Sequence, residues 1–363
     1  MQQFGASVNS VFNEQIYSPA VIASQLTALA GTGVTIARSD ALWEATEPSP
    51  PTAGRHTYNW RFDDAVAGAL ARVHLRWLPI IDYTAPWAAS IPGQEHTAPR
   101  VPDAFAAFAG AFAGRFGPGG SFWREHPELT AEPVDTYEIW NEPDVQFFWL
   151  PAPDPARYAD LYLRARNAIK LADPSARVIV GGLGHPETFV PALVAARPGI
   201  SAHIDGVAVH PYLPHPRDIL DRIRTDRGIL DTHGLAAVPL YVTETGWSTS
   251  PPHVPKWAPA RLRPGYIKRL IGAIGHTDCR IAATVLYSWM TPDRNPGLVD
   301  EWFGIHPPAG GETNDTRAFA AGLRAATEPQ PPASIRALAE RFRCPAASAA
   351  SLSDAGSGRP ATP

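Results

Sequence analysis

Short β-rich runs alternate along the chain with stretches that have the spacing of amphipathic helices, and this alternation constrains the fold more than any other feature. Several helical stretches begin with Pro, which suits the first turn of a helix because its missing N–H is not needed there. The eight predicted strands are 4–8, 34–38, 75–81, 136–140, 177–181, 206–210, 240–243 and 282–287. The predicted helices are 19–30, 62–72, 102–116, 155–171, 186–196, 216–233, 260–274 and 316–326.

Eight β-then-α units with almost continuously apolar strands indicate a closed parallel barrel, whose strands are covered on both faces. The predicted fold class is therefore α/β, a single-domain (β/α)8 TIM barrel. A doubly wound open sheet is the alternative, and its ligand site would need a glycine-rich turn directly after an early strand. Gly31 and Gly33 instead come before a strand, which favours the barrel.

Residues 1–344 are predicted to form the barrel domain, with a short helix over 334–343 at its end. Residues 293–314 are rich in Gly, Pro and Asp, and we expect this segment to fold over the barrel mouth. In residues 345–363, Ala, Ser, Gly and Pro make up 15 of 19 positions, which predicts a disordered tail.

Composition excludes several classes of function. The net charge of −4 offers no basic field for nucleic acid, and no apolar run approaches the ~20 residues that a membrane span needs. Cys279 and Cys344 are the only two cysteines, too few for a cysteine-based zinc site, and they form either one bridge or two free thiols. Since no leader is visible after Met1, we expect a soluble protein that is cytoplasmic, or secreted if a leader has been removed.

In a barrel of this kind, catalytic groups come from the carboxyl ends of different strands, where the βα loops converge on one cavity. Glu142 follows the fourth predicted strand and Glu244 follows the seventh. Two carboxyl groups across a cavity are the minimum apparatus for cleaving an acetal, since one protonates the leaving oxygen while the other attacks or stabilises the anomeric carbon.

Two motifs carry a resemblance to a known family. The segment YEIWNEP (137–143) and the segment YVTETGW (241–247) resemble the acid/base and nucleophile segments of clan A glycoside hydrolases, the retaining "4/7" superfamily. The spacing from Arg38 to Trp43 and on to Glu47 and Pro48 is most similar to family 39 and its single-domain relatives, with family 5 close behind. The resemblance covers residues 4–327, and we expect no room for the extra β-sandwich of family 39 xylosidases either before or after these residues.

The resemblance implies a role for each matching residue. Glu142 would be the general acid/base and Glu244 the nucleophile. Their carboxyl groups would lie about 5–5.5 Å apart, as the retaining mechanism requires. Asn141 would bind the sugar 2-hydroxyl, and the cation of Arg38 would hold the pKa of Glu244 low. Tyr212 would be the aromatic residue that is hydrogen-bonded to the nucleophile. His210 would be a histidine on the substrate side, and Trp289 would form the floor under the sugar.

Further aromatic and polar residues at the strand ends are candidates for substrate contact, because flat apolar rings suit the C–H faces of sugars. Residues 147–149, a run of two Phe and one Trp, are the best candidates for a sugar platform. The other candidates are Trp43, Asp82, Trp87, Trp149, Trp247 and His185.

The predicted function is a retaining glycoside hydrolase that acts on β-type bonds of a poly- or oligosaccharide, without metal or other cofactor. The long aromatic loops favour endo-action over exo-action, and a carbohydrate is the only partner expected of a chain that we take as a monomer. The alternatives are a transglycosylase, a catalytically silent carbohydrate-binding barrel and a metal-dependent hydrolase. The last would need a His-x-His or His-Glu-x-x-His motif, and neither occurs in the sequence.

Overall fold

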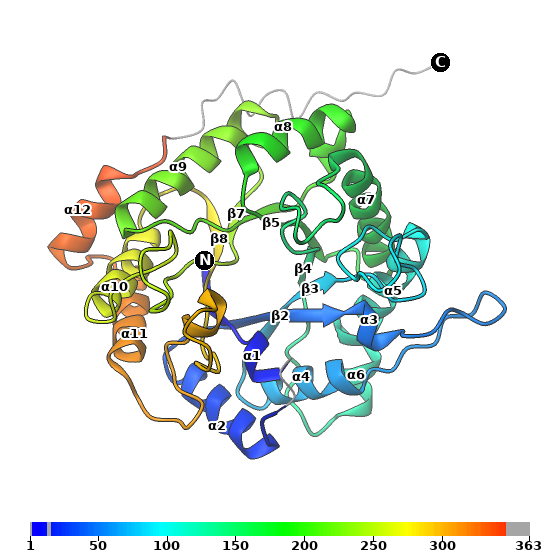
Figure 1. Ribbon diagram of the computed structural model, residues 1–363, viewed down its shortest axis with the longest axis horizontal. Coiled ribbons are helices and arrows are strands. Elements are labelled where there is room, and N and C mark those ends of the chain that lie inside the picture. Colours follow the sequence, from blue (N-terminus) through cyan, green and yellow to red (C-terminus); the bar gives the residue numbers. More distant parts are fainter. Residues whose placement is uncertain (1, 13–15, 346–363) are drawn as a thin grey trace.

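The computed structural model describes residues 2–12 and 16–345, and its centre is a closed barrel of eight parallel strands in sequence order (Figure 1). The predicted fold class is confirmed. The strands are β1 (Gln3–Ser7), β2 (Ile36–Leu42), β3 (Arg76–Asp82), β4 (Thr136–Ile139), β5 (Arg177–Leu183), β6 (Gly206–Val209), β7 (Leu240–Val242) and β8 (Ile281–Leu286).

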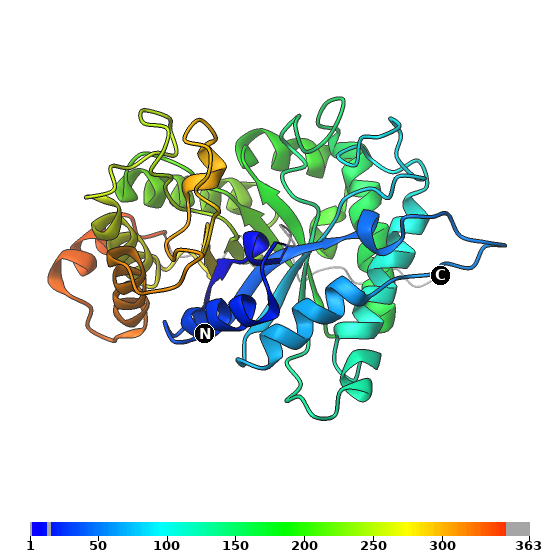
Figure 2. The ribbon, with the colours of Figure 1, turned by 60° about the horizontal axis from the view of Figure 1, so that its bottom comes forward.

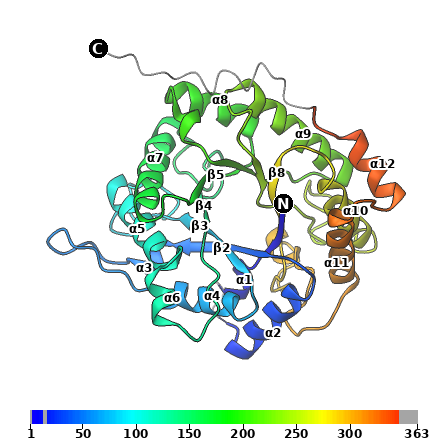
Figure 3. The same ribbon diagram turned by 180° about the vertical axis from the view of Figure 1, so that it is seen from behind.

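Helices surround the barrel and cover its outer face (Figures 1 and 3). Several begin with side chains that accept hydrogen bonds from free N–H groups, such as Ser18 before α2, Asp154 before α7 and Thr313 before α11. The helices are α1 (Asn9–Phe12), α2 (Pro19–Ala30), α3 (Trp43–Thr46), α4 (Arg61–Ala71), α5 (Pro102–Phe116), α6 (Ser121–Glu125), α7 (Pro155–Ala172), α8 (Pro186–Ala196), α9 (Pro216–Thr232), α10 (Arg263–Ile274), α11 (Asn314–Thr327) and α12 (Ala333–Arg341), with 3-10 turns at Ile200–His203 (η1) and Val299–Trp302 (η2).

The barrel interior is filled at one level by apolar side chains and above them by polar ones. A buried cluster inside the barrel includes Ile36 of β2, Leu78 of β3 and Val285 of β8. Because side chains alternate along a strand, Arg38 and Asp40 lie on the same face of β2 as Ile36. Charged residues are therefore built into the strands themselves, toward their carboxyl ends.

Two strand boundaries differ from the prediction in ways that matter for the site. Strand β2 continues to Leu42, so Asp40 belongs to the strand and not to a loop. Strand β4 ends at Ile139 because Trp140 and Glu142 have φ values of 69° and 46°, in the left-handed region that non-glycine residues rarely adopt. The short helices α1, α3 and α6 were not predicted, since four or five residues show no helical period.

The loops that follow β7 and β8 lie side by side and form one wall of the barrel mouth (Figure 2, yellow-green and orange). The N–H of Thr249 donates to the carbonyl of Trp302, and the hydroxyl of Ser250 donates to that of Pro296. Arg263 donates to the carbonyls of Trp302 and Gly304 and pairs with Asp315. The predicted excursion after the eighth strand thus takes its place at the mouth.

A disulfide joins Cys279, just before β8, to Cys344, just after α12, which decides the question that the sequence left open. The predicted helix near the C-terminus is present as α12, and the predicted tail lies outside the described residues beyond Pro345. Among the helices of the described chain, we find none with the length and apolar character to cross a membrane.

Candidate active site

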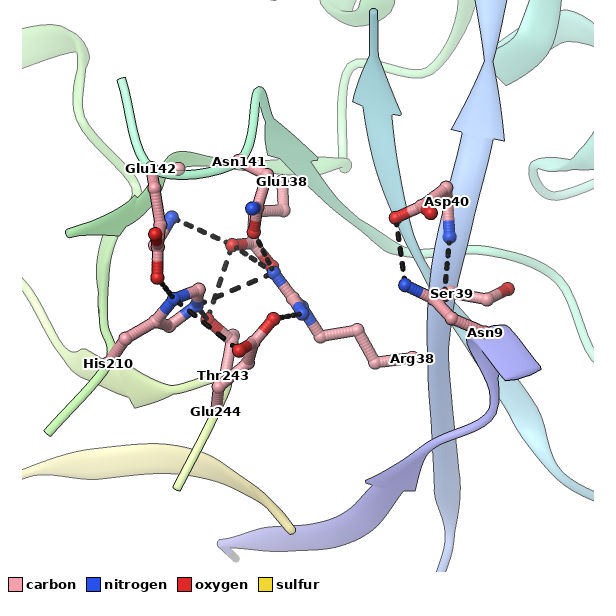
Figure 4. Close-up of polar contacts among 12 residues, drawn as sticks. Asn9, Arg38, Ser39, Asp40, Glu138, Asn141, Glu142, His210, Thr243 and Glu244 are labelled. Atoms are coloured by element: carbon pink, nitrogen blue, oxygen red, sulfur yellow. Dashed lines mark hydrogen bonds and ion pairs between the residues drawn. The ribbon is translucent and has the colours of Figure 1, made fainter. Parts of the chain in front are cut away.

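Glu142 and Glu244 face each other in a cavity of about 550 Å³ at the carboxyl ends of the strands. Glu142 lies three residues beyond the end of β4 and Glu244 two residues beyond the end of β7. A carboxylate oxygen of one lies within 4.8 Å of a carboxylate oxygen of the other. Figure 4 shows both side chains converging on His210.

Both carboxylate oxygens of Glu244 accept hydrogen bonds. Arg38 Nη1 donates to Oε1 at 2.7 Å, and the Tyr212 hydroxyl donates to Oε2 at 2.6 Å. Burial alone would raise the pKa of Glu244, but the charges of His210 and Arg38 and these two hydrogen bonds lower it to about 2. Arg38 and Tyr212 thus lie where the resemblance implied, and Glu244 is ionised at neutral pH.

Arg38 is fully buried and connects Glu244 to a second carboxylate, Glu138 of β4. Its Nε and Nη2 donate to the two oxygens of Glu138 at 2.8 and 2.9 Å, and Nη2 also donates to Asn141 Oδ1 at 3.1 Å. Burial lowers the pKa of Arg38, but the charges of Glu138 and Glu244 outweigh this and hold it well above its usual value. Sequence reasoning missed Glu138, although a lone carboxylate in an apolar strand was the signal.

His210 connects the two glutamates of the cavity. Its Nδ1 lies 2.7 Å from Glu142 Oε1 and 3.8 Å from Glu244 Oε2, while Nε2 lies 3.1 Å from the Thr243 hydroxyl. Burial lowers the pKa of His210, but Glu244 and Glu142 raise it above its usual value. The resemblance implied a position on the substrate side for His210. Its side chain is instead fully buried, so His210 lies beneath the cavity wall and orients the glutamates.

Four tryptophans predicted to contact substrate lie in the core instead, and for them the prediction is wrong. Each of them donates a hydrogen bond from its indole N–H or packs its ring against other residues of the barrel. Trp289, the predicted sugar floor, donates to Gln25 Oε1 and stacks on His306. The others, all at most 1% exposed, are Trp43, which packs on Phe105, Trp149, which packs on Trp140, and Trp247, which donates to the Leu213 carbonyl.

Three further candidates also lie away from the cavity lining. Trp87 is half-buried and donates to the Glu47 carbonyl. His185 precedes α8, and its mostly exposed ring lies 3.6 Å from Glu187. Asp82 is fully buried, and burial followed by the charge of Asp40 raises the pKa of its carboxyl well above the usual value. These residues are neighbours of the site but not part of its surface.

The cavity surface contains polar and aromatic residues that were not predicted. Of the predicted platform, Phe147 and Phe148 line the cavity, whereas Trp149 does not. Tyr287, directly after β8, lines the cavity, whereas Trp289 does not; its place two residues after the inward-facing Val285 was the available signal. The other lining residues, which were not among the candidates for substrate contact, are Asn9, Asp40, Tyr83, His96, Val145, Lys256 and Asp300.

Within the described part of the chain, Glu142, His210 and Glu244 form a group that could hold a metal ion, since their ligand atoms lie within 4.8 Å of one another. Two carboxylates and one imidazole suit several divalent metals. However, Glu244 is already held by Arg38 and Tyr212, and His210 by Glu142 and Thr243. This arrangement fits a proton-handling site better than an open coordination site.

The fold and site define a (β/α)8 barrel with paired glutamates after β4 and β7, and solved structures of this fold include glycoside hydrolases. A family 39 glycoside hydrolase from Bacteroides cellulosilyticus WH2 superposes with a TM-score of 0.67 at 18% identity, covering 89% of this chain and 64% of that one. A GH39 β-xylosidase from Caulobacter crescentus gives 0.66 at 19% identity (88% and 70%). A GH5_18 protein from Streptomyces cattleya, in complex with Manβ1-4GlcNAc, gives 0.67 at 16% identity (91% and 82%).

Sequence comparison points the same way. A β-xylosidase from Geobacillus stearothermophilus is 28% identical over 161 residues, which are 38% of this chain and 31% of that protein. The chain thus matches about a third of the length of its curated relative, and no family model matches it. Its structural neighbours include family 39 and family 5 glycoside hydrolases, as the sequence resemblance predicted, and at these identities the likeness shows the shared fold.

Proposed function

We propose that this protein is a retaining glycoside hydrolase. The observation that carries the proposal is the pair Glu142 and Glu244, whose oxygens approach within 4.8 Å across the cavity. Retaining enzymes place their two carboxyl groups ~5–5.5 Å apart, whereas inverting enzymes leave ~6.5–9.5 Å for a water molecule. The close approach therefore favours double displacement.

In this mechanism Glu244 is the nucleophile. Its low pKa keeps it ionised, and Arg38 and Tyr212 fix both oxygens so that one can be presented to the anomeric carbon. Attack forms the bond from Glu244 to the anomeric carbon and breaks the bond to the leaving oxygen. The product of this step is a covalent glycosyl-enzyme intermediate.

Glu142 is the proposed acid/base. As the leaving oxygen departs it receives the proton of Glu142, and the resulting carboxylate then takes a proton from the water that hydrolyses the intermediate. His210 holds Glu142 Oε1 at 2.7 Å and so fixes the direction of this proton transfer. Asn141, held by Arg38, lines the cavity beside both glutamates and would bind the sugar 2-hydroxyl.

We propose exo-action in place of the endo-action that the aromatic loops favoured. That preference relied on long aromatic loops after the second, third, fourth and seventh strands. Three tryptophans of these loops, Trp43, Trp149 and Trp247, are buried in the core. A β-xylosidase and an exo-β-1,4-mannosidase are among the similar proteins, which supports removal of terminal sugars from a carbohydrate substrate.

The test is a panel of 4-nitrophenyl β-glycosides and polysaccharides, with products resolved by size and by anomeric configuration. We expect release of a monosaccharide with retained configuration. An inverted product would contradict double displacement, and a product one sugar longer than its donor would indicate transglycosylation. Hydrolysis that is lost on strong chelation would instead favour a metal-dependent hydrolase.

Variants of the two glutamates test their roles. We expect Glu142→Ala and Glu244→Ala to lower activity by at least about 100-fold, because acid–base catalysis alone contributes ~10²–10⁴-fold. External azide should give a glycosyl azide of inverted configuration with Glu244→Ala, and of retained configuration with Glu142→Ala, which still forms the intermediate. Identical products from both would show that the roles are wrongly assigned, and wild-type binding without turnover would favour the silent barrel.

A further inference from the structure

A second polar cluster lies on the cavity wall formed by β2 and the segment after β1, and it consists of Asn9 and Asp40. Asn9 Nδ2 donates to Asp40 Oδ1 at 3.1 Å, and the backbone N–H of Asp40 donates to Asn9 Oδ1 at 3.0 Å. These reciprocal hydrogen bonds fix the Asn9 amide. Figure 4 shows the pair beside β2, with the Arg38 side chain between it and the two glutamates.

The position of Asp40 follows from the register of β2. Asp40 comes two residues after Arg38, so its side chain leaves the same inward face of the strand, ~6–7 Å nearer the mouth. In the closed order of eight strands, β2 lies opposite β6, which precedes His210 and Tyr212. Arg38 reaches across this space to Glu244, so Asn9 and Asp40 border the same cavity from the opposite side.

The chemistry of the pair suits a sugar diol. A carboxylate accepts hydrogen bonds and an amide N–H donates them, while each sugar hydroxyl can do both. The second Nδ2 hydrogen of Asn9 has no partner within residues 2–12 and 16–345, although the side chain lines the cavity. One hydroxyl can therefore accept from Asn9 while its neighbour donates to Asp40.

We propose that Asn9 and Asp40 form a subsite for vicinal hydroxyls of the bound sugar, at the end of its ring remote from the anomeric carbon. This rests on the proposed function, which places the anomeric carbon at Glu244. A hydroxyl that donates to Asp40 carries no further sugar. The subsite therefore selects a terminal, unsubstituted sugar and makes the enzyme exo-acting.

The experiment uses the 4-nitrophenyl glycoside that the wild type cleaves fastest, together with its 3-deoxy and 4-deoxy analogues. We expect at least one deoxygenation to lower wild-type kcat/KM by about tenfold or more, because it removes a hydrogen bond to a charged group. In Asp40→Asn the same deoxygenation should lower kcat/KM by less than about threefold, because the substitution has already weakened the contact that the deoxygenation removes. Asn9→Ala should reduce the cost in the same way.

Asp300→Asn is the matched control, because it removes another carboxylate from the same cavity. In Asp300→Asn, deoxygenation should lower kcat/KM by as much as it does in the wild type. This result would separate a specific contact with Asp40 from a general loss of negative charge. Thermal unfolding of each variant checks that the fold is kept. If the deoxygenation costs in folded Asp40→Asn and Asn9→Ala equal that of the wild type, the subsite is overturned.

A measurement without turnover distinguishes failure of the subsite from failure of the proposed function. Calorimetric titration with an iminosugar and its deoxy analogues makes the same comparison by binding alone. Equal wild-type affinities for all of them would overturn the subsite even if glycosides are hydrolysed. Unequal affinities that become equal in Asp40→Asn would support it even if the panel shows no hydrolysis.

Discussion

At the scale of single residues, the site depends on one buried cation that serves two carboxylates. Arg38 forms a bidentate pair with Glu138 and reaches Glu244 with its remaining nitrogen. A buried charge is costly unless it is paired, and removing one partner leaves the others uncompensated. Arg38 is thus both a structural and an electrostatic requirement, which is why a conservative replacement is the better probe of its role.

We expect Arg38→Lys to move the acidic limb of the pH profile of kcat/KM to higher pH. Lysine cannot reproduce the forked contacts, so the pKa of Glu244 should rise from about 2 by ~1–3 units, and the active ionised form should be lost earlier on acidification. His210→Gln should shift the limb in the same direction, because the charge of His210 also lowers this pKa. Incubation at each pH followed by assay at neutral pH separates titration from unfolding, and an unmoved limb would refute the electrostatic role.

At the scale of secondary-structure elements, the end of β5 makes room for its neighbours. A Cβ on Gly181 would lie 2.0 Å from the carbonyl oxygen of Trp140, and one on Gly182 would lie 1.9 Å from His210 Nε2. The N–H of Gly182 also donates to Glu138. Glycine at these positions lets β4 and β6 present Glu138 and His210 within one hydrogen-bonded network.

We expect Gly182→Ala to displace the His210 ring and to lower kcat by about tenfold or more, because Glu142 loses the partner that orients it. Gly228→Ala is the control for the same chemical change, since a Cβ there meets nothing within 4 Å in helix α9. The control should gain ~0.5–1 kcal/mol of stability and keep full activity. Full activity of Gly182→Ala would show that the position of His210 is not critical.

Helix α4 contains a pH-dependent destabilising group. Asp63 is buried, one of its oxygens has no hydrogen-bond partner among the described residues, and burial raises the pKa of its carboxyl to about 7. Between about pH 4 and pH 7 the folded protein therefore binds a proton that the unfolded chain has released, so stability falls as pH rises through this range. In Asp63→Asn, the free energy of unfolding measured in urea should fall less steeply between pH 4 and pH 8. An unchanged dependence of this free energy on pH would contradict the assignment.

At the scale of the whole molecule, the disulfide closes a long segment on the side of the barrel opposite the cavity. Cys279 precedes the amino end of β8 and lies 65 residues from Cys344, whereas the cavity is at the carboxyl ends. Cross-linking a segment of this length restricts the unfolded chain and stabilises the fold by about 4 kcal/mol in the chain-entropy model.

Reduction should therefore lower the thermal midpoint while kcat/KM at moderate temperature stays unchanged. The double variant Cys279→Ser/Cys344→Ser should show the lower midpoint without reductant and should not respond to it. An equal midpoint with and without reductant in the wild type would contradict the stabilising role, and a large loss of activity would indicate coupling to the site.

The barrel and the centre of the site could be predicted because their signals are local. The strand period and the two motifs predicted Glu142, Glu244 and Arg38 at one end of the barrel, and the structure brings these three side chains together there. Phe147 and Phe148 line the cavity, whereas the predicted tryptophans do not, because tertiary packing decides which way each ring turns. Trp289 is held by Gln25, 264 residues away, and this decides whether the ring is in the core or in the cavity. Lys256 and Asp300 come from long loops with no period, so nothing in the sequence indicated which side chains turn inward.

The linked loops after β7 and β8 have a consequence for engineering. Lys256 stands on the first loop and Asp300 on the second, and backbone hydrogen bonds such as that from Thr249 to Trp302 join the two. Arg263 adds a clamp that holds the second loop from the base of α10. A new specificity transplanted from another barrel by exchanging one of these loops would leave the other without its backbone partners. The two loops are therefore best grafted together, with Arg263 and Asp315, as a single exchangeable cassette.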